Sequence, residues 1–183
     1  MVTFHPVTLE NNTSKEQFQN ILCVLDKLRE TSIIFTKANA DTGGRIINKM
    51  MDQYVSRNPA KTIAVTSLGY LRYLSTMRFV DAVVGNSSSG IVEAPSFRIG
   101  TINIGDRQRG REKSESVIDC EPTKKSILEA FKILYSQNFQ ERLKNIKNPY
   151  GDGHSAGRVK KILKEYKFKN TLKKRFYDIE FKI

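Results

Sequence analysis

Apolar residues along this chain follow two spacings, short continuous runs typical of buried strands and a spacing of three to four residues typical of helices. The runs predict strands at 1–5, 32–37, 62–66, 81–85, 101–104 and 117–120. The helical spacing predicts helices near 13–28, 46–54, 70–78, 91–97, 124–135, 139–145 and 155–167. At the start of the first helix, Thr13 and Glu16 have the spacing of a capping box.

Strands that alternate with helices predict an α/β fold, with right-handed crossovers and a parallel sheet covered by helices on both faces. A length of 183 residues suffices for one domain with a full core. Ligands of such sheets bind outside the carboxyl ends of the strands. Polar residues that follow the strands are therefore the candidates for function.

The net charge of +12 suggests a nucleic-acid partner, but its distribution argues against one. Residues 154–183 hold ten Lys and Arg against three Asp and Glu. Charge concentrated in a terminal segment is typical of a solvated helix or of an arm that contacts another part. No RNA-binding aromatic motif, zinc-finger spacing or basic-region heptad accompanies it. We expect no nucleic-acid partner.

The two cysteines, Cys23 and Cys120, are far apart and outside any CxxC motif, which favours a reducing compartment. The first twelve residues lack the pattern of a signal peptide, and no apolar run is long enough to cross a membrane. We therefore expect a cytoplasmic chain without a membrane partner.

The segment VVGNSSSGIVE at 83–93 carries the richest candidate chemistry, because an apolar strand leads through small residues into a helix. Small residues let the backbone approach an anion, and the first N–H groups of a helix have no partner within it. Ser87 and Ser88 would thus face phosphates, and Glu93, about one turn further on, could accept hydrogen bonds from ribose hydroxyls. The same residues also describe a serine-rich helix start with a solvated glutamate, and this alternative stays open.

Neither GxGxxG nor the P-loop pattern GxxxxGK[ST] occurs in the chain, so a nucleoside diphosphate is favoured over a dinucleotide or a triphosphate. The other candidates are His5 after the first strand, Asn39 and Asp41 after the second, Ser67 and Leu68 after the third, and Asp106 and Arg107 after the fifth. Without a ligand, Asn39 and Asp41 would be turn residues, and His5 would stabilise a loop. Arg107, with the neighbouring arginines, could equally belong to a solvated loop.

Five motifs share one order: HPVT at 5–8, NADTG at 39–43, GNSSSG at 85–90, IGDRQRGR at 104–111 and NPYGDG at 148–153. In this order they resemble the C-terminal half of the hydrolysing UDP-N-acetylglucosamine 2-epimerases of sialic acid and polysialic acid capsule synthesis. The non-hydrolysing branch has a His-Arg-Arg-Glu-Asn run where this chain has HPVT. The resemblance extends from residue 1 to about residue 158.

The resemblance implies one half of a two-domain, glycosyltransferase-B-like fold. Residues 1–158 would form a Rossmann-like UDP-binding domain, and residues 159–183 a basic helix and tail that cross back to a missing N-terminal domain. In that family the carboxylates that handle the proton at C2 of the sugar belong to the N-terminal domain. The chain alone is therefore expected to be inactive, whether it is an excised domain or the product of a split gene.

Carried over residue by residue, the resemblance places Asn39 and the backbone at Leu68 beside uracil. It places Ser87 and Ser88 at the phosphates, Glu93 at the ribose hydroxyls, and Arg107 at the edge of the nucleotide. His5 would reach toward the diphosphate or the sugar, as the one candidate for a catalytic residue in this half. No metal or other cofactor is implied, and the sequence shows no cluster of metal ligands.

The reaction implied is hydrolysis of UDP-N-acetylglucosamine to N-acetylmannosamine and UDP through a glycal. Two alternatives stay open, a 2-epimerase for UDP-diacetylbacillosamine and the nucleotide domain of a glycosyltransferase. The expected partners are UDP, UDP-N-acetylglucosamine, the missing N-terminal domain and, as a further possibility, a second copy of the chain.

Overall fold

The computed structural model describes residues 1–7, 13–39, 43–167 and 179. The chain divides into two compact units, Met1–Tyr150 and Gly151–Ile183. The first unit holds β1 (Val2–Thr3), α1 (Ser14–Leu25), β2 (Ile33–Thr36), α2 (Gly44–Arg57), β3 (Thr62–Val65), α3 (Gly69–Thr76), β4 (Ala82–Gly85), α4 (Ser89–Val92), the 3₁₀ turn η1 (Ala94–Phe97), β5 (Gly100–Ile104), β6 (Val117–Cys120), α5 (Lys124–Leu134) and α6 (Gln137–Leu143). The second unit holds α7 (Ser155–Glu165). All six predicted strands are confirmed.

The strands form one parallel sheet in the order β3-β2-β1-β4-β5-β6. This is the strand order of doubly wound nucleotide-binding domains, whose ligands bind where the order reverses. Here the reversal lies between β1 and β4, whose registered pairs are Val2 with Val84 and Thr3 with Gly85. The predicted α/β fold with a parallel sheet is confirmed.

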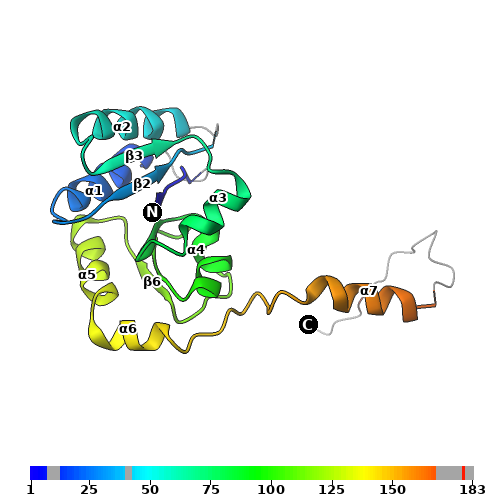
Figure 1. Cartoon of the computed structure of the whole chain (residues 1–183). Helices are drawn as coiled ribbons and strands as arrows, with labels where there is room; N and C mark the ends of the chain where they lie inside the picture. Colours follow the sequence, from blue (N-terminus) through cyan, green and yellow to red (C-terminus); the bar gives the residue numbers. More distant parts are fainter. Residues whose placement is uncertain (8–12, 40–42, 168–178, 180–183) are drawn as a thin grey trace. The chain divides into compact units, whose positions relative to one another are not determined.

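Helices cover both faces of this sheet (Figure 1). On one face α1 packs between α2 and α5, and the main core contains the side chains of Phe18, Ile21 and Leu25, each at most 2% exposed. On the other face a smaller cluster joins Met77, after α3, to Val83 of β4. Complete burial of such a side chain contributes about 1.5–3 kcal/mol. The two clusters hold the sheet from both sides and leave its carboxyl edge for the loops.

The predicted capping box at the start of α1 is wrong. The backbone of Thr13 is already helical (φ −76°, ψ −20°), and its side chain accepts no capping hydrogen bond. An N-cap residue usually has an extended backbone, which brings its side-chain oxygen over the first N–H groups. Instead, Gln17 Nε2 donates to Thr13 Oγ1 over 3.2 Å, and α1 depends on its buried apolar face.

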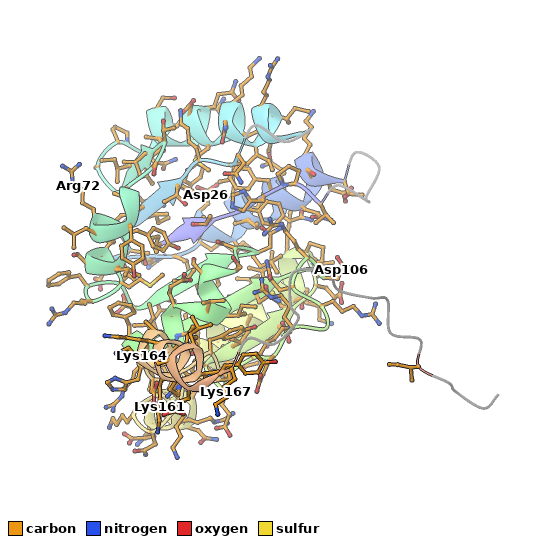
Figure 2. All side chains as sticks on the ribbon, turned by 90° about the vertical axis from the view of Figure 1, so that its right-hand side faces the viewer. Asp26, Arg72, Asp106, Lys161, Lys164 and Lys167 are labelled. Carbon is orange, nitrogen blue, oxygen red and sulfur yellow. The ribbon has the colours of Figure 1, made fainter. Side chains whose placement is uncertain are left out.

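The second unit presents an amphipathic helix without a buried residue. Val159, Ile162, Leu163 and Tyr166 recur at helical spacing and are 54–61% exposed. Figure 2 shows Lys161, Lys164 and Lys167 projecting from this part of the chain. The predicted domain boundary after residue 158 lies within this unit, and most of the predicted tail, residues 168–178 and 180–183, lies outside the described residues.

The turn before α7 is held by an ion pair. Arg158 Nη1 and Nη2 each donate to a carboxylate oxygen of Asp152 over 3.0 Å. Asp152 Oδ1 also accepts from the His154 backbone N–H over 3.0 Å. These contacts lower the pKa of Asp152 to about 2. Asp152 thus lies close to the start of α7, and its contacts are those of a structural residue.

Candidate functional site

The carboxyl ends of β1 and β4 meet at the reversal of the strand order, and a glycine makes this approach possible. Gly85 has φ +133°, and a Cβ at this position would lie 1.9 Å from the carbonyl oxygen of Thr3. No other residue type fits there without moving the backbone. The loops after β1 and β4 are thereby brought together.

Asn86, directly after β4, connects these two loops. Its side-chain Oδ1 accepts from the His5 backbone N–H over 2.8 Å, and its Nδ2 donates to the His5 carbonyl oxygen over 2.8 Å. Its backbone N–H donates to the Thr3 carbonyl oxygen over 3.2 Å. Asn86 is only 1% exposed, so these bonds are shielded from water. We call this arrangement the Asn86 clasp; it fixes His5 relative to the serine turn that follows Asn86.

The backbone carbonyl oxygen of Asn86 also accepts hydrogen bonds from two side chains of the loop after β5. Arg107 Nη1 donates to it over 3.0 Å, and Gln108 Nε2 donates to it over 2.8 Å. Gln108 is buried, whereas Arg107 is exposed. The predicted residues His5 and Arg107 therefore both form hydrogen bonds with Asn86. The sequence analysis missed Asn86 and Gln108 as members of the site, because an amide that bonds the backbone has no sequence signature.

The serine turn, Ser87 to Ser89, has backbone donors available. In the described part of the chain no group accepts a hydrogen bond from the N–H of Ser87 or of Ser88. The Ser87 hydroxyl lies 3.4 Å from both the backbone nitrogen and the hydroxyl oxygen of Ser89. Donors without a partner at a strand end suit an anionic ligand such as a phosphate.

The helix predicted at 91–97 is wrong in its length and continuity. The structure has the four-residue α4, followed by the 3₁₀ turn η1 with Pro95 near its start. Proline lacks the N–H that would continue the ladder of hydrogen bonds. A long helix dipole is therefore absent here, and the candidate donors to an anion are the N–H groups of the turn and the Arg107 guanidinium.

A second glycine, Gly90, allows α4 to pack closely against the sheet. A Cβ on Gly90 would lie 2.5 Å from Thr101 Cγ2, and the Thr101 hydroxyl donates to the Gly90 carbonyl oxygen over 2.7 Å. Since Thr101 belongs to β5, this contact holds α4 close to the sheet. The serine turn and Glu93, at the two ends of α4, are held with it.

Glu93 follows α4 and is half-buried. Its Oε2 atom is buried and has no hydrogen-bond partner among the described residues. A carboxylate oxygen left in this state is unfavourable by about 1–3 kcal/mol or more. Such an oxygen is the expected feature of a site that awaits a donor from a ligand, for example a ribose hydroxyl. The alternative of a fully solvated glutamate does not fit this burial.

A cavity of about 320 Å³ lies at the carboxyl ends of β1, β2 and β3. It is lined by Thr3, His5, Thr36, Lys37, Asn39, Thr66, Ser67, Leu68, Gly69, Tyr70 and Tyr73. Four predicted candidates, His5, Asn39, Ser67 and Leu68, thus line the same cavity. Asp41 lies outside the described residues.

His5 is 8% exposed, and its Nδ1 accepts from the Asn39 backbone N–H over 3.5 Å. The long contact joins the loop after β1 to the loop after β2. The catalytic role predicted for His5 stays a prediction.

A larger cavity, of about 620 Å³, lies at the opposite edge of the sheet. It is lined in part by Met1, Ile33 and Ala82 at the amino ends of the strands, and by Phe79 and Tyr135. It contains no predicted site residue. Burial there lowers the pKa of the Met1 amino group to about 6.

Within residues 1–7, 13–39, 43–167 and 179, no group of three or more His, Cys, Asp or Glu side chains is placed to hold a metal ion. Over the same ranges, no helix has both the length and the apolar character required to span a bilayer.

Comparison with known proteins gives a consistent result. The sequence profile of the UDP-N-acetylglucosamine 2-epimerase family matches residues 1–164. A "GDP/UDP-N,N'-diacetylbacillosamine 2-epimerase (hydrolyzing)" of Campylobacter jejuni is 41% identical over 98% of this chain and 46% of its own length. "Polysialic acid biosynthesis protein P7" of Escherichia coli is 34% identical over 98% of this chain and 46% of its own length. The chain thus spans about half the length of these relatives.

Among solved structures, the UDP-N-acetylglucosamine 2-epimerase of Neisseria meningitidis bound to UDP-GlcNAc superposes with a TM-score of 0.72. The match covers 90% of this chain and 44% of that protein, at 15% sequence identity. At this identity the likeness concerns the fold, and it agrees with the doubly wound sheet described above.

Proposed function

The chain belongs to the UDP-N-acetylglucosamine 2-epimerase family, and we propose that it is the UDP-binding half of a hydrolysing 2-epimerase. In this proposal the ribose lies at Glu93, the diphosphate at the serine turn and Arg107, and the base in the cavity lined by Asn39 and Leu68. His5 lies between the diphosphate and the sugar.

The observation that carries the proposal is the buried, unpartnered Oε2 of Glu93. It lies one short helix away from the serine turn, whose Ser87 and Ser88 N–H groups have no partner within the described part of the chain. A free acceptor and free donors at this spacing match a ligand that carries hydroxyls at one end and an anion at the other. A nucleoside diphosphate has this arrangement, since its ribose hydroxyls and phosphates lie on opposite sides of the sugar ring.

The chemistry of this half is stabilisation of the leaving group. When the bond between the anomeric carbon and the β-phosphate oxygen breaks, the electron pair stays on UDP and its negative charge increases. Backbone N–H groups and the Arg107 guanidinium interact more strongly with that state than with the bound substrate, and such differential binding accelerates the reaction. The Asn86 clasp holds these groups in place before the bond breaks.

Two sugars are candidates for the substrate. The first is UDP-N-acetylglucosamine, in line with the family profile. The second is UDP-diacetylbacillosamine, which the name of the C. jejuni relative favours at 41% identity. The chain covers less than half the length of these relatives. In our proposal the residues that recognise the sugar therefore lie mainly in the half that this chain does not match.

We also propose that α7 packs on that other half. Its apolar face, formed by Val159, Ile162, Leu163 and Tyr166, is exposed. An exposed apolar stripe of this kind is typical of a helix that lacks its packing partner.

Replacement of Glu93 by Gln is expected to weaken UDP binding about 10- to 150-fold, because a hydrogen bond to a charged acceptor contributes about 1.5–3 kcal/mol. Binding of 2′,3′-dideoxy-UDP, which lacks the ribose hydroxyls, should hardly change. Calorimetric titration of both ligands into the wild-type chain and the variant measures this difference. The thermal midpoint should be nearly unchanged, because Oε2 has no partner to lose within the described residues.

The matched control is Glu121→Gln, which changes an exposed glutamate after β6 and should bind UDP like the wild type. An equal loss of affinity for UDP and dideoxy-UDP in Glu93→Gln would mean that Glu93 is a structural residue. A wild-type chain that binds neither ligand would contradict the proposed function itself.

A further inference from the structure

We propose that Tyr73 is a positioning residue, which holds the serine turn through Ser89 and so couples the base cavity to the phosphate site. The proposal rests on the proposed function, because it assumes that a nucleoside diphosphate occupies this site. Tyr73 is absent from the residues that sequence and resemblance predicted.

Tyr73 belongs to both parts of the site. It lines the cavity of about 320 Å³ together with Asn39 and Leu68. Its hydroxyl forms a hydrogen bond with the hydroxyl of Ser89, the first residue of α4. One side chain of α3 thus connects the wall of the base cavity with the turn that faces the phosphates.

The backbone of the serine turn is held by hydrogen bonds from the Ile91 and Val92 N–H groups to the Ser88 carbonyl oxygen, over 3.0 and 2.9 Å. The other side-chain contacts of Ser87 and Ser89 are weak, which makes the bond to Tyr73 important for the Ser89 side chain. Ser87 and Ser89 contact each other only at 3.4 Å, through their hydroxyls and through the Ser89 backbone N–H. Donor–acceptor distances near 2.9 Å are typical of strong bonds, and strength falls at longer distance. Among the side-chain hydrogen bonds that Ser89 makes within the described part of the chain, the bond to Tyr73 is therefore the one that can fix its rotamer.

The surroundings of the Tyr73 hydroxyl leave it able to donate a hydrogen bond. Burial raises the pKa of the phenol, and the nearby Glu93 carboxylate raises it further, against a lowering by the Ser89 and Thr3 hydroxyls. The phenol is therefore protonated at neutral pH, and in its hydrogen bond with the Ser89 hydroxyl either group can donate. The Tyr73 side chain packs against the buried cluster that contains Met77 and Val83, so its position is set by the core of this face.

Tyr73→Phe separates the two roles, because phenylalanine keeps the ring and its packing and removes only the hydroxyl. We expect UDP to bind about two- to twelvefold more weakly, which is the effect of one lost neutral hydrogen bond. Uridine, which lacks the phosphates, should bind within about twofold of the wild type. Ser89→Ala should show a similar loss for UDP, and the double variant no more than either single variant, since all three remove the bond between Tyr73 and Ser89.

Titration calorimetry of UDP and uridine into the full chain provides the measurement, with thermal unfolding as a check of the fold. Tyr135→Phe, at the opposite edge of the sheet, is the control and should bind both ligands like the wild type. If the wild type binds UDP but Tyr73→Phe loses nothing, loses both ligands equally, or adds its effect to that of Ser89→Ala, the positioning role is wrong while the proposed function stands. If the wild type does not bind UDP, both are wrong.

Discussion

The chain alone is expected to release no detectable N-acetylmannosamine from UDP-N-acetylglucosamine, and turnover should appear when the other half is supplied. The groups proposed here stabilise the departing UDP, but departure also requires a base that removes the proton from C2 of the sugar. Without that base, and without the second wall that orients the sugar, most of the barrier stays in place. The difference between the two conditions is therefore expected to be all or none.

The measurement uses the part of the C. jejuni relative that this chain does not match, expressed separately and mixed with the chain. UDP-N-acetylglucosamine and UDP-diacetylbacillosamine are offered in parallel, so that turnover is detected whichever of the two sugars the supplied half accepts. In D₂O the product should carry deuterium at C2, because the proton removed there is replaced from solvent. Turnover by the chain alone would show that a catalytic base lies among its 183 residues, and the division of roles would be wrong.

Replacement of Ser87 by Pro is expected to weaken UDP binding far more than replacement of Ser87 by Ala. Proline removes the backbone N–H and restricts the turn, whereas Ser87→Ala keeps the N–H and removes only the hydroxyl. Loss of one N–H that donates to a charged phosphate should weaken binding about 10- to 150-fold, against about twelvefold at most for alanine. Titration of UDP into both variants gives the comparison.

Uridine separates a local effect from a loss of the fold. A folded proline variant should keep the wild-type affinity for uridine, because the base cavity lies on β1, β2 and β3. A proline variant that is folded and binds UDP normally would remove Ser87 from the anion site.

The strands were predictable because each is a buried apolar run bounded by polar or small residues. Ile33 to Thr36 and Val117 to Cys120, for example, lie within or at the predicted ranges. Once strands alternate with helices, the parallel sheet follows, and with it the edge at which His5, Asn39 and Leu68 converge. This part of the site can therefore be predicted from the alternation of strands and helices and from the geometry of parallel strands alone.

Other features depend on tertiary contacts that periodicity does not report. The single helix predicted at 91–97 overlooked Pro95, which separates α4 from η1. The capping box failed because the backbone of Thr13 is helical, which the residue type does not determine. The roles of Asn86 and Tyr73 depend on bonds to residues distant in sequence, His5 in one case and Ser89 in the other. Amide and phenol groups occur in too many settings for their spacing to reveal such bonds.

The burial of Glu93 is also a tertiary effect, produced by the seat of α4 against Thr101. From the sequence, a glutamate after a short helix could equally be solvated. The pattern of residues 83–93 and the resemblance both predicted the ribose as its partner, and the structure adds an acceptor oxygen that has no hydrogen-bond partner within the described residues.

The most direct test of the central claim is a crystal structure of the chain with UDP. We expect the ribose hydroxyls within hydrogen-bond distance of Glu93, a phosphate on the N–H groups of Ser87 and Ser88, and the base in the cavity beside Asn39 and Leu68. UDP bound elsewhere, for example in the cavity beside Phe79 and Tyr135 at the opposite edge of the sheet, would contradict the assignment of this chain as the UDP-binding half.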